Sequence, residues 1–183
     1  MRLRSIPVLA AAVVGISACA TTPAATPTVT APATAPLIYP SGAGLQKKTN
    51  LRVVYGVGEK KLRQGMGEGL FFAKRLIDAW QREGVADSER VFVVTVYNES
   101  AEWLLNDAAW KRAHPDTPDS TNHSAALVAE LIQRGVHVEV CGMTMKQKGW
   151  VEADLLPGIV VVGGAYARIV DLQHQGFAYI PFF

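Results

Sequence analysis

The chain of 183 residues contains two cysteines, Cys19 and Cys141, and only Cys141 lies in a segment whose pattern predicts a folded domain. Cys141 ends an apolar, β-branched run over 136–141 that predicts a strand. In open α/β sheets, ligands bind at the carboxyl ends of the strands. A thiol at that edge is a candidate nucleophile, because the thiolate is the reactive form of cysteine.

The segment after Cys141 could stabilise such a thiolate. If residues 143–148 form a helical turn, their backbone N–H groups point back towards the sulfur, and nearby lysines add positive charge. The supporting residues expected from this arrangement are Gly142, Thr144 and Lys146. The alternative is that Cys141 only packs, since free cysteine is among the most buried residue types. The residue pattern leaves both interpretations open.

No cofactor or metal site is predicted from the remaining motifs. The glycines at 56–58 and 65–69 do not complete a dinucleotide or phosphate-binding motif. The histidines have no close ligand spacing. Two of them share a loop with two aspartates, and we interpret that loop as a solvated polar surface. The four histidines are His114, His123, His137 and His174.

The first residues carry the pattern of an export signal. Arg2 and Arg4 precede an apolar run over 6–16, which is shorter than the roughly 20 residues needed to span a bilayer. Residues 16–19 (ISAC) resemble a bacterial lipobox, although ordinary cleavage at a small-x-small site is an alternative. We expect residues 1–18 to be a lipoprotein signal peptide and Cys19 to be lipidated. Ala20 then favours the outer membrane, facing the periplasm.

Residues 19–48 are predicted to be a tether, because 20–40 consist mostly of Ala, Thr and Pro and carry no charge. Removal of residues 1–18 takes away two arginines and no acidic residue, so the formal charge falls from +2 to zero. A protein without excess positive charge is an improbable partner for nucleic acid.

Residues 49–183 are predicted to form one domain with alternating strands and helices. The β-branched runs predict strands at 51–57, 91–97, 136–141, 159–162 and 177–180. Helical periodicity or stop signals predict helices at 67–82, 101–111, 124–134, 143–148 and 166–173. Continuous apolar strands separated by helices indicate a parallel sheet covered on both faces. The expected class is a doubly wound, mostly parallel, five-stranded α/β fold.

Three segments of this domain resemble the DsrE/DsrF-like family: 138–146 (VEVCGMTMK), 154–159 (DLLPGI) and 175–180 (QGFAYI). The resemblance implies a sulfur carrier or sulfur-responsive protein with a persulfide on Cys141. Any enzymatic activity would be at most that of a sulfurtransferase-like sulfur carrier, and no cofactor is expected. The resemblance also implies a homo-oligomer, a trimer or hexamer, and a sulfur donor or acceptor as partner. An export signal departs from the mostly cytoplasmic relay members. The alternative is a noncatalytic ligand-binding or assembly protein in which Cys141 is structural.

Overall fold

In the computed structural model, residues 44–118 and 121–182 are described. The expected signal peptide, Cys19 and most of the tether lie outside these residues. Within the described ranges, no helix is long and apolar enough to cross a membrane.

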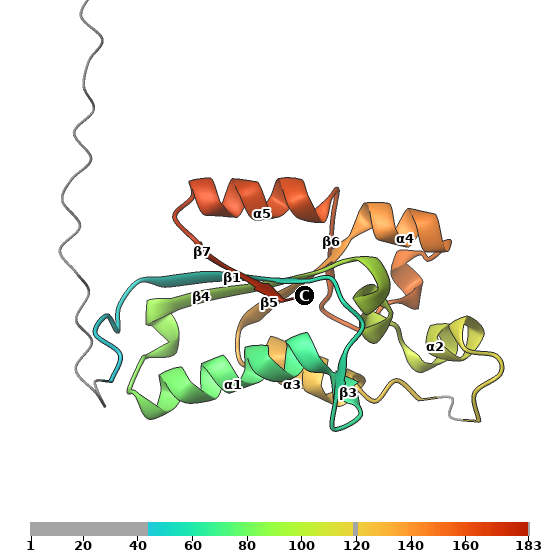
Figure 1. Cartoon of the computed structure of the whole chain (residues 1–183), viewed down its shortest axis with the longest axis horizontal. Coiled ribbons are helices and arrows are strands. Elements are labelled where there is room, and N and C mark those ends of the chain that lie inside the picture. Colours follow the sequence, from blue (N-terminus) through green and yellow to red (C-terminus); the bar gives the residue numbers. More distant parts are fainter. Residues whose placement is uncertain (1–43, 119–120, 183) are drawn as a thin grey trace, which may run out of the picture. The chain divides into compact units, whose positions relative to one another are not determined.

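A five-stranded parallel sheet forms the centre of the domain, as predicted (Figure 1). Its strands follow the order β6-β5-β4-β1-β7, and every neighbouring pair is parallel. Parallel strands require crossover connections, which the intervening helices supply. The strands are β1 (Leu51–Val57), β4 (Arg90–Val96), β5 (Val136–Cys141), β6 (Val160–Val162) and β7 (Ala178–Phe182).

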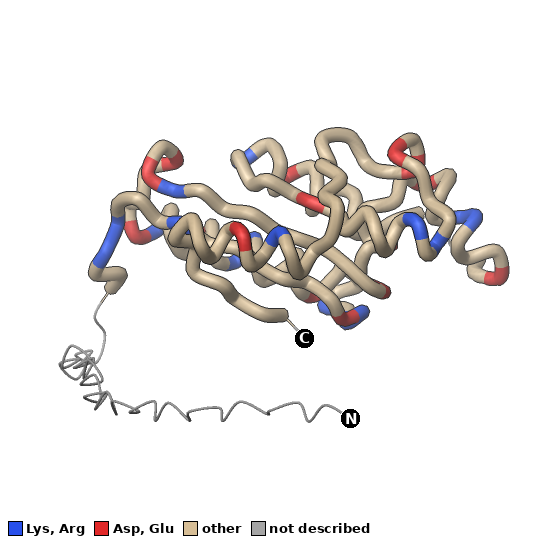
Figure 2. Tube along the Cα trace, turned by 90° about the horizontal axis from the view of Figure 1, so that it is seen from above, with Lys and Arg blue, Asp and Glu red and all other residues tan. Residues whose placement is uncertain are grey.

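Helices cover both faces of the sheet, which confirms the expected α/β class. Figure 1 shows α1 (Glu68–Arg82) and α3 (Ala125–Gln133) on one face and α5 (Ala165–His174) on the other. A shorter helix, α4 (Gly142–Lys148), follows β5 directly. Figure 2 shows acidic and basic positions interspersed along the described chain.

Two predictions of local structure were wrong. The single helix expected over 101–111 is two elements, the 3-10 helix η2 (Asn98–Leu104) and α2 (Asp107–Ala113). Asn106 separates them, because its side chain caps α2 by accepting the Ala109 N–H at 2.9 Å. A small hairpin, β2 (Leu62–Arg63) and β3 (Met66–Gly67), also precedes α1 where no strand was expected. Two short 3-10 helices, η1 (Asp87–Glu89) and η3 (Glu152–Asp154), complete the elements.

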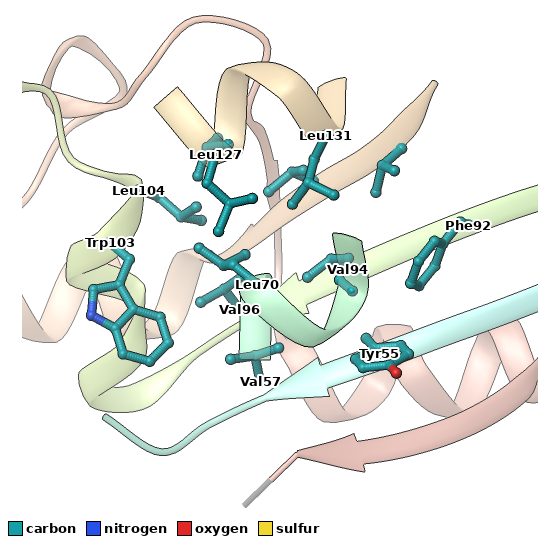
Figure 3. Packing of buried hydrophobic residues seen from close by; sticks show 14 of the residues in the cluster. Tyr55, Val57, Leu70, Phe92, Val94, Val96, Trp103, Leu104, Leu127 and Leu131 are labelled. Atoms are coloured by element: carbon teal, nitrogen blue, oxygen red, sulfur yellow. The ribbon is translucent and has the colours of Figure 1, made fainter. Parts of the chain in front are cut away.

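The two faces of the sheet bury apolar clusters of different size. The larger cluster lies between the sheet and α1, α3 and η2, and Figure 3 shows Leu70, Val96 and Leu131 packed within it. The smaller one lies under α5 and includes Val54, Tyr97 and Cys141. Alternation of side chains along β5 therefore places Cys141 on the α5 face, together with Glu139 two residues earlier.

Candidate functional site

Cys141 lies where β5 ends and α4 begins. It is the residue preceding the first residue of α4, with extended backbone angles of φ −69° and ψ 113°. It lines a cavity of about 530 Å³ to which η2, α4 and α5 also contribute residues. The other lining residues include Tyr97, Asn98, Met143, Thr144 and Tyr166. The predicted site therefore coincides with a cavity at the carboxyl edge of the sheet.

The Cys141 thiol is buried, with 6% of the residue exposed, yet its surroundings favour the thiolate. Burial raises the pKa of the thiol. Hydrogen bonds from the Thr144 and Ala165 N–H groups, the Thr144 hydroxyl and the Met143 N–H outweigh burial, so the pKa of Cys141 lies below its ordinary value. The donors come from the first turns of two helices, α4 and α5. The sulfur is therefore a buried thiol that is also activated.

Thr144 links the sulfur to the loop that follows β4. Its hydroxyl oxygen accepts a hydrogen bond from the Asn98 N–H at 3.1 Å, while the hydroxyl also donates to the Cys141 sulfur. Asn98 has a positive φ of 53°, a left-handed conformation that asparagine tolerates better than most residues. This turn carries the chain from β4 into η2 and points the Asn98 N–H at Thr144.

The other two residues expected to support the thiolate, Gly142 and Lys146, are not among the groups that lower its pKa. A Cβ at Gly142 would stand 2.9 Å from the Val162 carbonyl oxygen, so glycine there permits close approach of α4 to β6. Lys146 is exposed, is not among the residues lining the cavity, and does not contribute to the pKa shift of Cys141. Lys148 pairs with Glu99, at 2.7 Å between Nζ and Oε1. A direct role for Lys146 stays a prediction.

A buried ion pair beneath Cys141 was missed by sequence reasoning. Glu139 is 3% exposed, and its Oε1 lies 2.8 Å from Arg168 Nη2 and 3.0 Å from Arg168 Nε. Its Oε2 accepts a hydrogen bond from the Thr95 hydroxyl at 3.1 Å. A glutamate between two valines near the end of a predicted inner strand was the available signal. Arg168 follows Ala165 by one helical turn, so the pair connects β5 to the helix that donates to the sulfur.

Tyrosines form the wall of the cavity opposite α4. The ring of Tyr97 meets that of Tyr166 edge to face, with centroids 5.2 Å apart. Burial, followed by the neighbouring Tyr179 and Tyr166, raises the pKa of Tyr97 well above its ordinary value. Tyr97 therefore stays a neutral phenol over the physiological range. Tyr166 and Met143 are 67% and 63% exposed, which places two apolar side chains at the rim.

The histidines do not join this cavity. His114 and His123 line a separate, smaller one, and His137 and His174 are exposed. Across residues 44–118 and 121–182, no group of three His, Cys, Asp or Glu side chains is suited to hold a metal ion.

Comparison with protein families identifies the domain. The model of the DsrE/DsrF-like family matches residues 69–182, which include Cys141 and Arg168. The chain belongs to the DsrE/DsrF-like family. The matched part of this DsrE-like chain begins at the start of α1. β1 therefore lies outside the matched residues, even though it is an inner strand of the sheet.

The chain is also similar to solved structures. A protein of unknown function from Methanobacterium thermoautotrophicum, MTH1491, is similar at 25% identity over 72% of this chain and 99% of its own, with a TM-score of 0.51. The ychN protein from E. coli covers the same shares at 14% identity, with a TM-score of 0.48. Comparison with curated proteins found no match. MTH1491 supports the DsrE-like fold and leaves the activity open.

Proposed function

We propose that this DsrE-like protein carries sulfur as a persulfide on Cys141. The observation that carries the proposal is the sulfur's position: the thiol stands where β5 ends and α4 begins, at the carboxyl edge of the sheet, and lines a cavity of about 530 Å³. The same donors that stabilise a thiolate suit the terminal sulfur anion of a persulfide. Membership of the DsrE/DsrF-like family supports this chemistry.

The loading step needs only a polysulfide as co-reactant. The Cys141 thiolate attacks one sulfur of the polysulfide, a new S–S bond forms at Cys141, and the S–S bond next to the attacked sulfur breaks. The shorter polysulfide or hydrosulfide leaves with the electron pair of the broken bond. The Cys141 sulfur is oxidised and the departing sulfur is reduced, so the step requires neither a metal nor an organic cofactor. In the transfer step, an acceptor thiolate attacks the outer sulfur of the persulfide, the S–S bond to Cys141 breaks, and Cys141 leaves as the thiolate.

Intact-protein mass spectrometry tests the proposal. After polysulfide treatment, the folded full chain should gain the mass of one or more sulfur atoms, and a thiol reductant should remove it. Both chains carry Cys19→Ala, because Cys19 is the other thiol of the sequence, and Cys141→Ser is then the matched control that should gain nothing. Alkylation of Cys141 only after denaturation, without any Cys141-dependent gain of sulfur, would overturn the carrier function.

A noncatalytic assembly role is the second candidate, and the exposed apolar side chains favour it. Met143 and Tyr166 at the cavity rim, with Val170 on the next turn of α5, are each more than half exposed. Apolar side chains gathered in this way suit contact with another copy of the chain. Sedimentation velocity should then detect a homo-oligomer that Tyr166→Glu dissociates, with Tyr166→Phe as control. A monomer at all concentrations would exclude assembly.

Anchoring through Cys19 completes the proposed function. Lipid on Cys19 would hold the domain at the membrane, facing the periplasm, and Ala20 favours the outer membrane. Radiolabelled fatty acid should enter the wild-type chain and not Cys19→Ala. Equal labelling of both would contradict the anchor, and fractionation would show which membrane holds the protein.

A further inference from the structure

A second cavity, of about 180 Å³, is built around η2 and carries none of the chemistry proposed for Cys141. The two cavities share η2: Asn98 at its start lines the first, while Glu102 and Trp103 near its end line the second. The hairpin β2–β3 and the segment around α2 supply the other walls. Its lining residues include Lys60, Leu62, Glu102, Trp103, Trp110 and His114.

This cavity holds two polar atoms that lack hydrogen-bond partners. Across residues 44–118 and 121–182, two buried side-chain polar atoms have none, Trp103 Nε1 and Glu102 Oε1, and both residues line this cavity. Figure 3 shows the indole nitrogen of Trp103 on the side of the ring facing away from Leu70 and Val96. Trp103 is 1% exposed. Buried polar atoms are nearly always paired, and Glu102 Oε1 does face the ammonium group of Lys60, so the unpaired indole N–H of Trp103 is the atom that points to a ligand.

Neighbouring polar groups are already occupied and do not compete for a ligand. The Asn122 side-chain amide donates to the carbonyl oxygens of Trp103 at 2.8 Å and Leu105 at 2.7 Å. Its oxygen accepts the Ser124 N–H, and the Ser124 hydroxyl oxygen accepts the Gly67 N–H, both at 3.0 Å. Beside these groups, the Trp103 indole N–H has no partner, and Glu102 Oε1 has the Lys60 ammonium group next to it but accepts no hydrogen bond.

The Glu102 carboxylate already has a cationic neighbour in Lys60. Lys60 Nζ lies 2.8 Å from Glu102 Oε1, although its direction does not make a hydrogen bond. His114 Nε2 lies 3.3 Å from Glu102 Oε2. The other ring nitrogen, Nδ1, donates to the Trp110 carbonyl oxygen at 3.0 Å, since a carbonyl can only accept. A carboxylate already faced by an ammonium group favours an uncharged ligand over an ion.

The walls of the cavity indicate the shape and polarity of the remainder of the ligand. The rings of Trp110 and His114 stack, with centroids 4.1 Å apart and planes at 28°. Leu62, which is 60% exposed, lies at the mouth. The buried polar atoms without a hydrogen bond belong to Glu102 and Trp103, and the other walls include the stacked aromatic rings. One polar head on a flat apolar body therefore matches this cavity of about 180 Å³.

We propose that this cavity binds a small uncharged molecule in which one carboxamide or hydroxyl group is attached to a flat apolar body. A carboxamide N–H donates to Glu102 Oε1 and its carbonyl oxygen accepts from Trp103 Nε1. A single hydroxyl performs both roles. The apolar body lies against the stacked rings of Trp110 and His114.

A series of isosteric probes tests the proposal on the full chain labelled with ¹⁵N. The chain has four tryptophans, and loss of one indole N–H resonance in Trp103→Phe identifies that of Trp103. Benzamide and benzyl alcohol are the neutral probes, and benzoate and benzylamine are their charged counterparts. We expect the Trp103 indole resonance to move saturably with the neutral probes, which should bind at least about tenfold more tightly than the charged ones.

Variants locate the binding. Trp103→Phe keeps an aromatic ring but removes the donor, so affinity read from the Trp110 indole should fall by about tenfold. Trp150→Phe, the same change outside this cavity, should leave it unchanged. Cys141→Ser should also bind normally, which separates this site from the sulfur-carrier function. A Trp103 resonance that no probe moves saturably means a water-filled cavity and overturns the proposal, as does tighter binding of a charged probe. These two results come from the wild-type chain, so they hold even if a variant does not fold.

Discussion

Arg168 of α5 holds the buried carboxylate of Glu139 with two of its nitrogens, Nη2 at 2.8 Å and Nε at 3.0 Å from the same oxygen. Both residues lie within the part of the chain that matches the DsrE/DsrF-like family. The pair ties α5 to β5 two residues before Cys141. Its integrity therefore bears on stability and on the position of the Ala165 N–H that donates to the sulfur.

Arg168→Met should destabilise the protein by about 2 kcal/mol, less than for a fully buried pair, because Glu139 is left buried without its partner but the Arg168 side chain is 32% exposed. Urea unfolding followed by circular dichroism measures this. The double variant Glu139→Gln with Arg168→Met removes the uncompensated charge and should regain a large part of the loss. A double variant as unstable as Arg168→Met would contradict this account.

Thr144→Val should slow alkylation of Cys141 at pH 7 by about fivefold, because it removes a hydroxyl that donates to the thiolate. The pKa of Cys141 lies below its ordinary value, so the rate in the wild type should rise and level off at lower pH than for a free cysteine. The profile of Thr144→Val should shift to higher pH. Thr144→Ser keeps the hydroxyl, so its pH profile should stay close to that of the wild type. An equal shift of the profile in both variants would show that the hydroxyl does not lower the pKa of Cys141.

Gly67→Ala should cost about 3 kcal/mol or more, since an added Cβ would stand 2.3 Å from Trp103 Cε3 inside the core. The backbone of Gly67 has φ −56° and ψ 118°, which any residue adopts, so the cost is purely steric. Gly163→Ala is the matched control, because a Cβ there meets nothing within 4 Å. Thermal unfolding of both variants measures the difference. Equal melting temperatures would show that the chain relaxes around position 67.

Asp78 should make stability depend on pH in the acid range. Burial raises the pKa of this carboxyl, but hydrogen bonds from Arg134 at 2.6 Å and Lys74 at 3.0 Å outweigh burial and hold the pKa below its ordinary value. Because the pKa of Asp78 is lower in the folded protein than in the unfolded chain, the ionised carboxylate stabilises the fold at any pH above the pKa of the unfolded chain. This stabilisation is lost as the pH falls through the pKa of the folded protein. Asp78→Asn should therefore cost about 1 kcal/mol at pH 7.

The cost of Asp78→Asn should shrink below about pH 4, where the aspartate of the unfolded chain becomes protonated. Urea unfolding at pH 7 and pH 3 measures it. Asp116→Asn, in an exposed position, is the control and should be neutral at both. A cost for Asp78→Asn that does not change with pH would mean that the substitution acts through packing.

The strands and the position of Cys141 could be predicted because β1, β4, β5 and β6 are rich in valine, and apolar residues also predominate in β7. The hairpin of β2 and β3 could not, since strands of two residues carry no periodicity. Arg168 lies 29 residues from Glu139, and nothing local in the sequence pairs them. The lack of a hydrogen-bond partner at the Trp103 indole nitrogen could not be predicted either, because it depends on which side chains surround that nitrogen in the folded chain.

The two edges of the sheet differ in how they resist unwanted strand addition. β6 has only three residues, too few to template a long intermolecular ladder. β7, at the other edge, contains Pro181, which lacks the N–H that an added strand would need at that position. A parallel sheet with a short strand at one edge and a proline at the other therefore offers incoming chains little continuous backbone to pair with. The same features that complete the fold thereby protect it against aggregation through its edges.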